Sequence, residues 1–153
     1  MVLDNVRSMH NVGAAFRIAD AFLVEKLYLC GITATPPHRE IRKTALGAEE
    51  HVAWEQAQNT RAVVQCLKKE GYVIVAVEQT ETSQTLHTFT YSPRQKYAIV
   101  FGHEVFGVQE AVLSACDVCL EIPQHGVKHS LNVSVCMGIV VWELAKKSLP
   151  HNT

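Results

Sequence analysis

Hydrogen-bonding and charged side chains cluster in four short segments of this sequence. Asn11 and Arg17 form the first cluster, and Glu78 with Gln79 forms the second. The other two are "GHEVFG" at 102–107 and "QHGVKHSLN" at 124–132, which leads into the most apolar stretch of the chain. Amide, carboxylate and guanidinium groups bind polar ligands, so these clusters are the candidate functional site.

A cysteine–histidine pattern offers a second kind of chemistry, because zinc is bound by such side chains. Cys116 and Cys119 form a C-x-x-C pair, and His125 and His129 follow it. The step from Cys119 to His125 is much shorter than in the usual zinc finger, and the chain has one C-x-x-C only. We therefore expect no metal, with Cys116 ending a helix and Cys119 beginning a buried strand as small apolar residues.

The elements that must position the polar clusters alternate along the chain. Hydrophobic spacing and turn residues predict strands over 2–5, 26–31, 72–77, 96–102 and 118–123, and helices over 11–22, 60–71, 108–117 and 131–148. Asn11 and Thr60 are the expected N-caps of two helices. The continuous apolar run "YVIVAV" is typical of a strand buried on both faces. The expected fold is a single α/β domain over 1–153 with a mostly parallel sheet flanked by helices.

This fold would bring together clusters that are far apart in the sequence. Each cluster follows a predicted strand, and parallel sheets bind their ligands beyond the carboxyl ends of the strands. Four loops would then converge on one pocket. In the last loop, Ser130 and Asn132 would cap the start of the apolar C-terminal helix as well as face that pocket.

The overall composition limits the class of partner and the compartment. The 14 basic residues are balanced by 15 acidic ones, so any nucleic-acid site must be a local patch, and Arg39, Arg42 and Lys43 form the strongest one. Five cysteines, an odd number, with no signal sequence and no apolar run of membrane length, indicate a cytoplasmic protein without membrane contact. Trp54 and Trp142 are expected to pack in the core or at a subunit interface rather than on bases.

Three segments resemble the motifs of the SpoU/TrmH family of RNA ribose 2'-O-methyltransferases, in the SPOUT superfamily. They are "NVGAAFRIADAF" (11–22), "VFGHEVFGV" (100–108) and "EIPQHGVKHSLNVSVCMGIVVWE" (121–143). The likeness runs from Val2 to Leu144. His103 stands where the family commonly has asparagine, and we expect it to make local hydrogen bonds. The N-terminal RNA-binding domain of several relatives is not expected in this chain.

The resemblance implies a specific reaction and assembly. The methyl donor would be S-adenosylmethionine, and the substrate a ribose 2'-hydroxyl of tRNA or rRNA. It also implies a homodimer with the active site near its interface. A trefoil knot in the C-terminal region is implied as well, which periodicity cannot reveal because threaded chains are rare exceptions to ordinary topology.

The same resemblance implies five catalytic residues. Arg17 matches the motif arginine, and because a guanidinium stays protonated it would hold an RNA phosphate and offset charge on the 2'-oxygen. The proton would pass to that phosphate, or to an arginine that the phosphate transiently deprotonates. Asn11 and Glu104 would orient Arg17, each other or the ribose. Ser130 and Asn132 would face the methyl-transfer site.

The resemblance also implies a cofactor pocket. Ile122 and Leu131 would enclose the adenine ring, and Gly102 would let the backbone approach the ligand closely because it has no Cβ. The predicted cofactor-binding residues are Val77, Glu78, Gly102, Ile122, Ser130 and Leu131. The predicted RNA contacts are Arg39, Arg42, Lys43 and Lys128.

Two other functions compete with this interpretation. The first is a catalytically silent RNA- or cofactor-binding module on the same fold, which the intact set of five polar residues disfavours. The second is a dinucleotide-dependent oxidoreductase, which is disfavoured because no G-x-G-x-x-G follows the first predicted strand.

Overall fold

The computed structural model describes residues 1–128, 130–146 and 148–149. Within these residues a seven-stranded sheet has the order β3-β2-β1-β6-β4-β7-β5, and each neighbouring pair is parallel. The predicted α/β fold with a mostly parallel sheet is therefore confirmed. The strands are β1 (Val2–Asp4), β2 (Leu27–Cys30), β3 (Trp54–Ala57), β4 (Tyr72–Val77), β5 (Gln84–Thr85), β6 (Lys96–Phe101) and β7 (Val118–Glu121).

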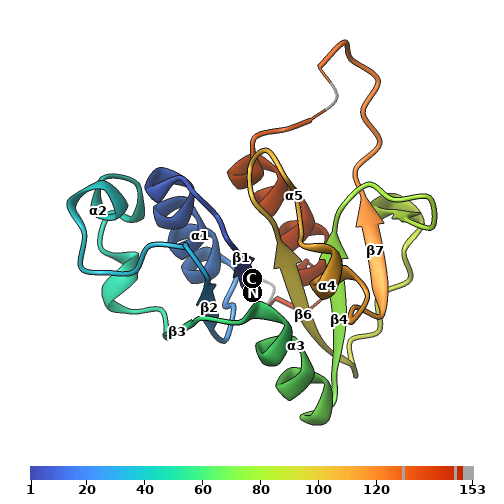
Figure 1. The fold of residues 1–153 in the computed structure, drawn as a ribbon, viewed down its shortest axis with the longest axis horizontal. Helices are drawn as coiled ribbons and strands as arrows, with labels where there is room; N and C mark the ends of the chain where they lie inside the picture. The colour runs from blue at the N-terminus through green and yellow to red at the C-terminus, as the bar shows by residue number, and fades with distance from the viewer. Residues whose placement is uncertain (129, 147, 150–153) are drawn as a thin grey trace.

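Helices cover both faces of the sheet (Figure 1). Core residues of α1 (Met9–Ala21), α2 (Arg39–Ala45) and α5 (Val133–Ala145) belong to one hydrophobic cluster, and those of α3 (Thr60–Lys69) and α4 (Glu110–Leu113) to another. Successive strand residues point to opposite faces, so Leu3 enters the first cluster and Val2 the second. Two short 3-10 turns, η1 (Ala48–Glu50) and η2 (Leu86–Thr88), lie in the connections.

Two helix starts differ from the sequence prediction. α1 begins at Met9, and Ser8 Oγ accepts a hydrogen bond from Asn11 N at 3.3 Å, so Ser8 is the N-cap. Asn59 caps α3 in place of Thr60, with its Oδ1 accepting from Ala62 N at 3.0 Å. The Asn11 side chain is consequently not used for capping and is available for another partner.

The remaining differences are missed elements and shifted ends of predicted ones. α2 and β5 lie in stretches for which the sequence predicted no helix or strand. β3 was missed, because its sequence "WEQA" is polar at two of four positions and it pairs on one side only, with β2. α4 is much shorter than the predicted 108–117, since Gly107 has a φ of 69° and the amides of Val108 and Gln109 donate to carboxylates. α5 is shorter than the predicted 131–148, and residue 147 of that range lies outside the described residues.

The third motif begins in a segment that leaves the body of the protein. Residues 122–128 extend away from the end of β7, and α5 then packs against the sheet (Figure 1). The trefoil knot implied by the resemblance is not visible in the described part of the chain. Of the helices in that part, none has the length and apolar character needed to cross a membrane.

Candidate active site

The four polar clusters meet at the carboxyl ends of β1, β6, β4 and β7, which are neighbours in that order. A pocket of about 410 Å³ opens there, hereafter the site pocket. Three of the four predicted loops, those after β4, β6 and β7, line this pocket. The cluster after β1 is attached to it through the Asn11–Glu104 hydrogen bond, and the roles of all these residues remain predictions. Glu104 and Asn132 line the pocket, together with all six residues predicted to bind a cofactor, namely Val77, Glu78, Gly102, Ile122, Ser130 and Leu131.

Glu104 joins the first two motifs. Its Oε1 accepts hydrogen bonds from Asn11 Nδ2 and Ser8 N, both at 2.9 Å, and its Oε2 accepts one from Arg7 N at 2.8 Å. Burial is the largest single influence on this carboxyl and raises its pKa, but the hydrogen bonds from Ser8, Asn11 and Arg7 together lower the pKa below its usual value. The predicted pairing of Asn11 with Glu104 is therefore present, and the carboxylate is held in its ionised form.

Arg17 lies six residues after Asn11 on α1 and is exposed to solvent. It makes no ion pair or side-chain hydrogen bond with any other residue in the described ranges. Neither Asn11 nor Arg17 is among the residues that line the site pocket. The structure thus shows no contact through which Asn11 or Glu104 orients Arg17, and the catalytic role of the arginine remains a prediction.

Gly102 lines the site pocket, as predicted, and packing gives it a further reason to be glycine. A Cβ at this position would collide with the backbone of Gly107 and Val108, so the close approach is between two protein segments. Glu78 holds the same segment, because its Oε2 accepts a hydrogen bond from Val108 N at 2.9 Å. The Cβ of any larger residue at Gly107 would collide with that carboxylate. Gly102 and Glu78 therefore shape the pocket wall by holding the second motif's loop.

Asp4 also holds the loop of the second motif, and the sequence analysis did not identify it. It is completely buried at the end of β1, and its Oδ2 accepts from Gln109 N at 2.9 Å. Its other oxygen accepts from the Thr60 hydroxyl and from Asn5 Nδ2. A charged residue among apolar ones at the end of a predicted strand was the available signal, because a buried carboxylate needs hydrogen-bonding partners.

His103 makes the local hydrogen bonds that were expected of it. Its Nδ1 accepts from Val105 N at 3.0 Å and from Phe106 N at 3.3 Å. The backbone of His103 also pairs with that of Gly107 in both directions. These bonds hold a tight loop whose tip carries Phe106, 83% exposed, with its ring centroid 4.8 Å from that of His103.

The third motif contributes the far wall of the pocket. Asn132 caps α5, since its Oδ1 accepts from Ser134 N at 2.8 Å, which confirms the predicted cap. Ser130 and Leu131 precede it and are exposed to solvent, whereas Ile122 is half-buried. Lys128 is exposed in the same segment. His129, considered above as a zinc ligand, lies outside the described residues.

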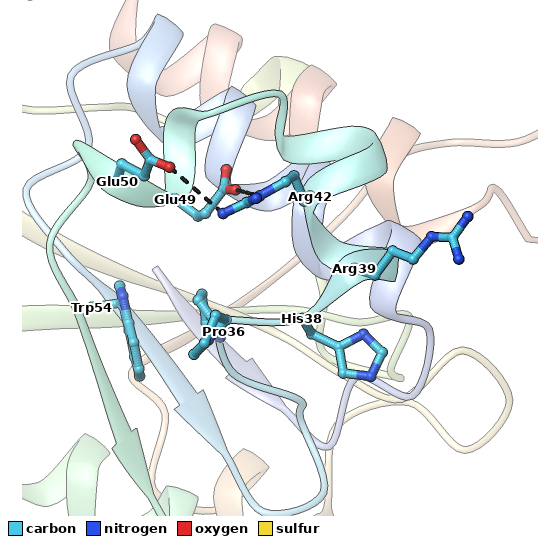
Figure 2. A pocket seen from close by; sticks show the side chains of 8 residues that line it. Pro36, His38, Arg39, Arg42, Glu49, Glu50 and Trp54 are labelled. Carbon is cyan, nitrogen blue, oxygen red and sulfur yellow. Dashed lines mark ion pairs between the residues drawn. The ribbon is translucent and has the colours of Figure 1, made fainter.

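The predicted basic patch is largely neutralised by neighbouring carboxylates. Arg42 lies 3.4 Å from Glu49 and 3.7 Å from Glu50, as Figure 2 shows. Lys43 Nζ lies 2.7 Å from Glu40 Oε1. In the structurally described ranges Arg39 makes no ion pair, and its side chain extends away from these carboxylates (Figure 2).

The two cysteines of the C-x-x-C pair are partly buried, as expected of small apolar residues. Cys116 follows α4, its Sγ donates to Val112 O at 3.2 Å, and burial raises the pKa of its thiol to about 12. Cys119 lies in β7, as predicted. Nowhere in residues 1–128, 130–146 and 148–149 do three or more His, Cys, Asp or Glu side chains gather in a way that could hold a metal ion.

The chain is similar to proteins that are named as RNA methyltransferases. The 23S rRNA (guanosine-2'-O-)-methyltransferase RlmB of Coxiella burnetii is 34% identical over 149 residues, which cover 96% of this chain and 58% of that protein. The mouse tRNA (guanosine(18)-2'-O)-methyltransferase TARBP1 is 28% identical, over 91% of this chain and 9% of that protein. The chain therefore spans little more than half of its bacterial relative.

Solved structures agree in fold. An AdoMet-bound rRNA methyltransferase from Sinorhizobium meliloti superposes with a TM-score of 0.90 at 26% identity, over 97% of this chain and 56% of that one. The TrmH/SpoU tRNA modifying enzyme of A. aeolicus gives 0.85 at 28% identity, over 95% and 73%. Residues 1–142 match the SpoU rRNA Methylase family. Since that match covers nearly all of the 153 residues, the chain belongs to the SpoU rRNA methylase family.

Proposed function

We propose that this chain transfers a methyl group from S-adenosylmethionine to a ribose 2'-hydroxyl of RNA. The site pocket carries this proposal, because the second and third motifs line it and the Asn11–Glu104 hydrogen bond attaches the first. Relatives named as 2'-O-methyltransferases and a structural neighbour solved with AdoMet support the same reaction.

The site pocket fits a nucleoside-sized cofactor. Its volume of about 410 Å³ lies within the range of roughly 300–1,000 Å³ that is usual for small-molecule sites. Ile122 and Leu131 offer apolar surface for the adenine ring, and Ser130 offers a hydroxyl. The bound cofactor would supply an electrophilic methyl group on a positively charged sulfur. Glu78 would act indirectly, since its carboxylate already binds the amide of Val108.

Arg17 is proposed to hold the RNA phosphate beside the target ribose. Its exposed guanidinium is not engaged by another described residue, so two parallel hydrogen bonds to a phosphate are open to it. There it would offset negative charge on the 2'-oxygen while the hydroxyl proton passes to the phosphate. Asn11 and Glu104 would fix the start of α1, and thereby the direction of the helix that carries Arg17.

The RNA is proposed to be a tRNA or an rRNA, since relatives of both kinds match the chain. Arg39 and Lys128 are proposed to contact phosphates directly, since neither makes an ion pair with another described residue. Arg42 and Lys43 would first have to exchange a carboxylate partner for a phosphate. The exposed side chain of Phe106, at the tip of the loop beside the site pocket, offers a flat surface to an unstacked base.

A homodimer is proposed from the outer face of α5. Val135, Ile139 and Trp142 lie at helical spacing on this face and are 49%, 39% and 50% exposed. Such an exposed apolar stripe is unfavourable in water, and a second copy of the chain would cover it. We also propose a cytoplasmic location, where the five cysteines, all free thiols, would stay reduced.

The test uses tritium-labelled S-adenosylmethionine, the purified protein and total RNA from cells that lack its gene. Label recovered as a 2'-O-methylnucleoside after nuclease digestion would establish the reaction and identify the RNA. Cofactor binding without label would favour the catalytically silent module. Failure to bind the cofactor would refute the assignment of the site pocket.

A further inference from the structure

A second pocket, of about 440 Å³, lies between α2 and the edge strand β3. None of its lining residues lines the site pocket. Trp54 and Pro36 lie on opposite sides of it, and the Arg42–Glu49–Glu50 ion pairs form its roof (Figure 2). Hereafter it is the Trp54 pocket, lined by Pro36, Pro37, His38, Arg39, Arg42, Glu49, Glu50 and Trp54.

The walls of the Trp54 pocket suit a flat aromatic ligand. Trp54 is half-buried and packs partly on the core, but its indole also faces the pocket, so the expectation of a purely internal role is incomplete. The prolines opposite are rigid and apolar. Proteins that bind single-stranded RNA stack its unpaired bases on such aromatic surfaces.

The charged side chains around the Trp54 pocket form two groups. Arg39 lies at its rim and makes no ion pair with another residue in the described parts of the chain, so its charge is available to a phosphate. Arg42 pairs with both Glu49 and Glu50, which makes the roof a polar surface with donors and acceptors and with an excess of one formal negative charge. This arrangement matches a nucleotide, which has one anionic group and a flat base with a polar edge.

The Trp54 pocket is rigidly connected to the candidate active site. α2 is fastened to the start of α1 by a His10 Nε2–Glu40 Oε2 contact of 2.8 Å and by the Thr44 hydroxyl, which donates to His10 O at 2.8 Å. His10 is followed directly by Asn11, the partner of Glu104. A nucleotide in the Trp54 pocket would therefore lie at a fixed distance from the site pocket.

We propose that the Trp54 pocket binds one unstacked nucleotide of the substrate RNA, different from the one that is methylated. Its base inserts between Trp54 and Pro36, and its phosphate contacts Arg39. The pocket thereby selects RNA that presents a second unpaired nucleotide at the right separation from the target. This inference rests on the proposed function, since it takes RNA as the substrate.

The test measures RNA affinity with fluorescein-labelled bulk tRNA and fragmented rRNA. Trp54→Leu is expected to weaken binding about tenfold or more, and Trp54→Phe to retain most of it, because stacking needs an aromatic face. Arg39→Ala is expected to weaken binding and to lower the salt dependence by about one ion. Arg61→Ala, which removes an exposed arginine from α3 on the opposite face, is the matched control and is expected to bind almost normally.

Three results would overturn the proposal. They are unchanged RNA affinity in a folded Trp54→Leu protein, equal losses in Trp54→Leu and Trp54→Phe, or equal losses in Arg39→Ala and Arg61→Ala. If Trp54→Leu does not fold, two other measurements decide whether the pocket binds RNA. They are the comparison of Arg39→Ala with Arg61→Ala, and the quenching of Trp54 fluorescence by RNA in a Trp142→Phe background. If the wild-type chain methylates RNA and the Trp54 and Arg39 variants bind RNA normally, the Trp54 pocket is refuted as a nucleotide site and the proposed reaction stands. If RNA binding depends on Trp54 but no methylation occurs, the proposed reaction is refuted and the nucleotide site stands.

Discussion

The side-chain amide of Asn11 donates a 2.9 Å hydrogen bond to the carboxylate of Glu104, which lies 93 residues further along the chain. The same carboxylate accepts the backbone amides of Arg7 and Ser8, just before α1. The loop after β6 therefore fixes the start of the helix that carries Arg17. This bond is the physical link between the first and second family motifs.

The Asn11–Glu104 bond predicts coupled effects of substitution. Asn11→Ala and Glu104→Ala should each destabilise the protein, and the double variant should be less destabilised than the sum, by about 1 kcal/mol. Urea unfolding of the four proteins measures this coupling. The matched substitution Asn59→Ala, at the N-cap of α3, should be additive with Glu104→Ala. Additivity for Asn11 as well would contradict the proposed link.

Substitution of Arg17 is predicted to change the methylation rate and to leave the affinity for the cofactor unchanged. Arg17→Ala should lower the methylation rate about 100-fold or more, as expected when a group that stabilises transition-state charge is lost. Arg17→Lys should recover only part of it, because an ammonium group cannot make the two parallel hydrogen bonds of a guanidinium. S-adenosylmethionine affinity, measured by calorimetry, should be unchanged in both. A large fall in that affinity would assign Arg17 to the cofactor site instead.

The lowered pKa of Glu104 predicts a specific pH dependence of stability. Because the folded-state pKa is below the usual 4.5, the stabilisation is complete above that pH and is lost as the pH falls through the folded-state pKa. Glu104→Gln, which keeps the shape but not the charge, should be less stable than the wild type at neutral pH. The difference in unfolding free energy should shrink between pH 5 and strongly acidic pH, and a constant difference would count against this assignment.

Gly13 of the first motif is predicted to be required by packing. A Cβ there would collide with Thr44 Oγ1 and with the backbone of Ile41 on α2. Gly13→Ala should therefore destabilise the protein by roughly 1–3 kcal/mol, despite the better helix propensity of alanine. Gly138→Ala on α5, where the nearest atom is Ile18 Cδ1 at 4.0 Å, is the control. It should be neutral or slightly stabilising in thermal unfolding.

The apolar stripe of α5 predicts the effect of a charge at the proposed dimer interface. Ile139→Glu should shift the protein towards monomer, since it would bury an unpaired carboxylate. Sedimentation equilibrium measures the change, and Gln65→Glu, an exposed position on α3, serves as the control. A wild-type protein that is monomeric at all concentrations would remove the basis of the dimer proposal.

The sequence determined the class of fold and the parts of the site pocket that follow β4, β6 and β7. Continuous apolar runs such as 72–77 and 96–101 can be buried on both faces only in a covered parallel sheet, and polar residues directly after such strands must meet at one edge. For this reason Val77, Glu78, Ile122 and Leu131 were placed correctly beside the site pocket. The strand β3 escaped prediction because an edge strand needs only one apolar face.

Only the tertiary structure decided which side chain meets which. The Asn11 side chain is free to bind Glu104 because Ser8 caps the helix, and the backbone at 107–108 leaves no room for a Cβ at Gly102. The pairing of Arg42 with Glu49 and Glu50 likewise depends on the turn at Gly47, between α2 and η1. Sequence periodicity specifies which face of an element is apolar, but hydrogen bonds and ion pairs depend on distances of about 3–4 Å. Those distances are set only when the elements pack together.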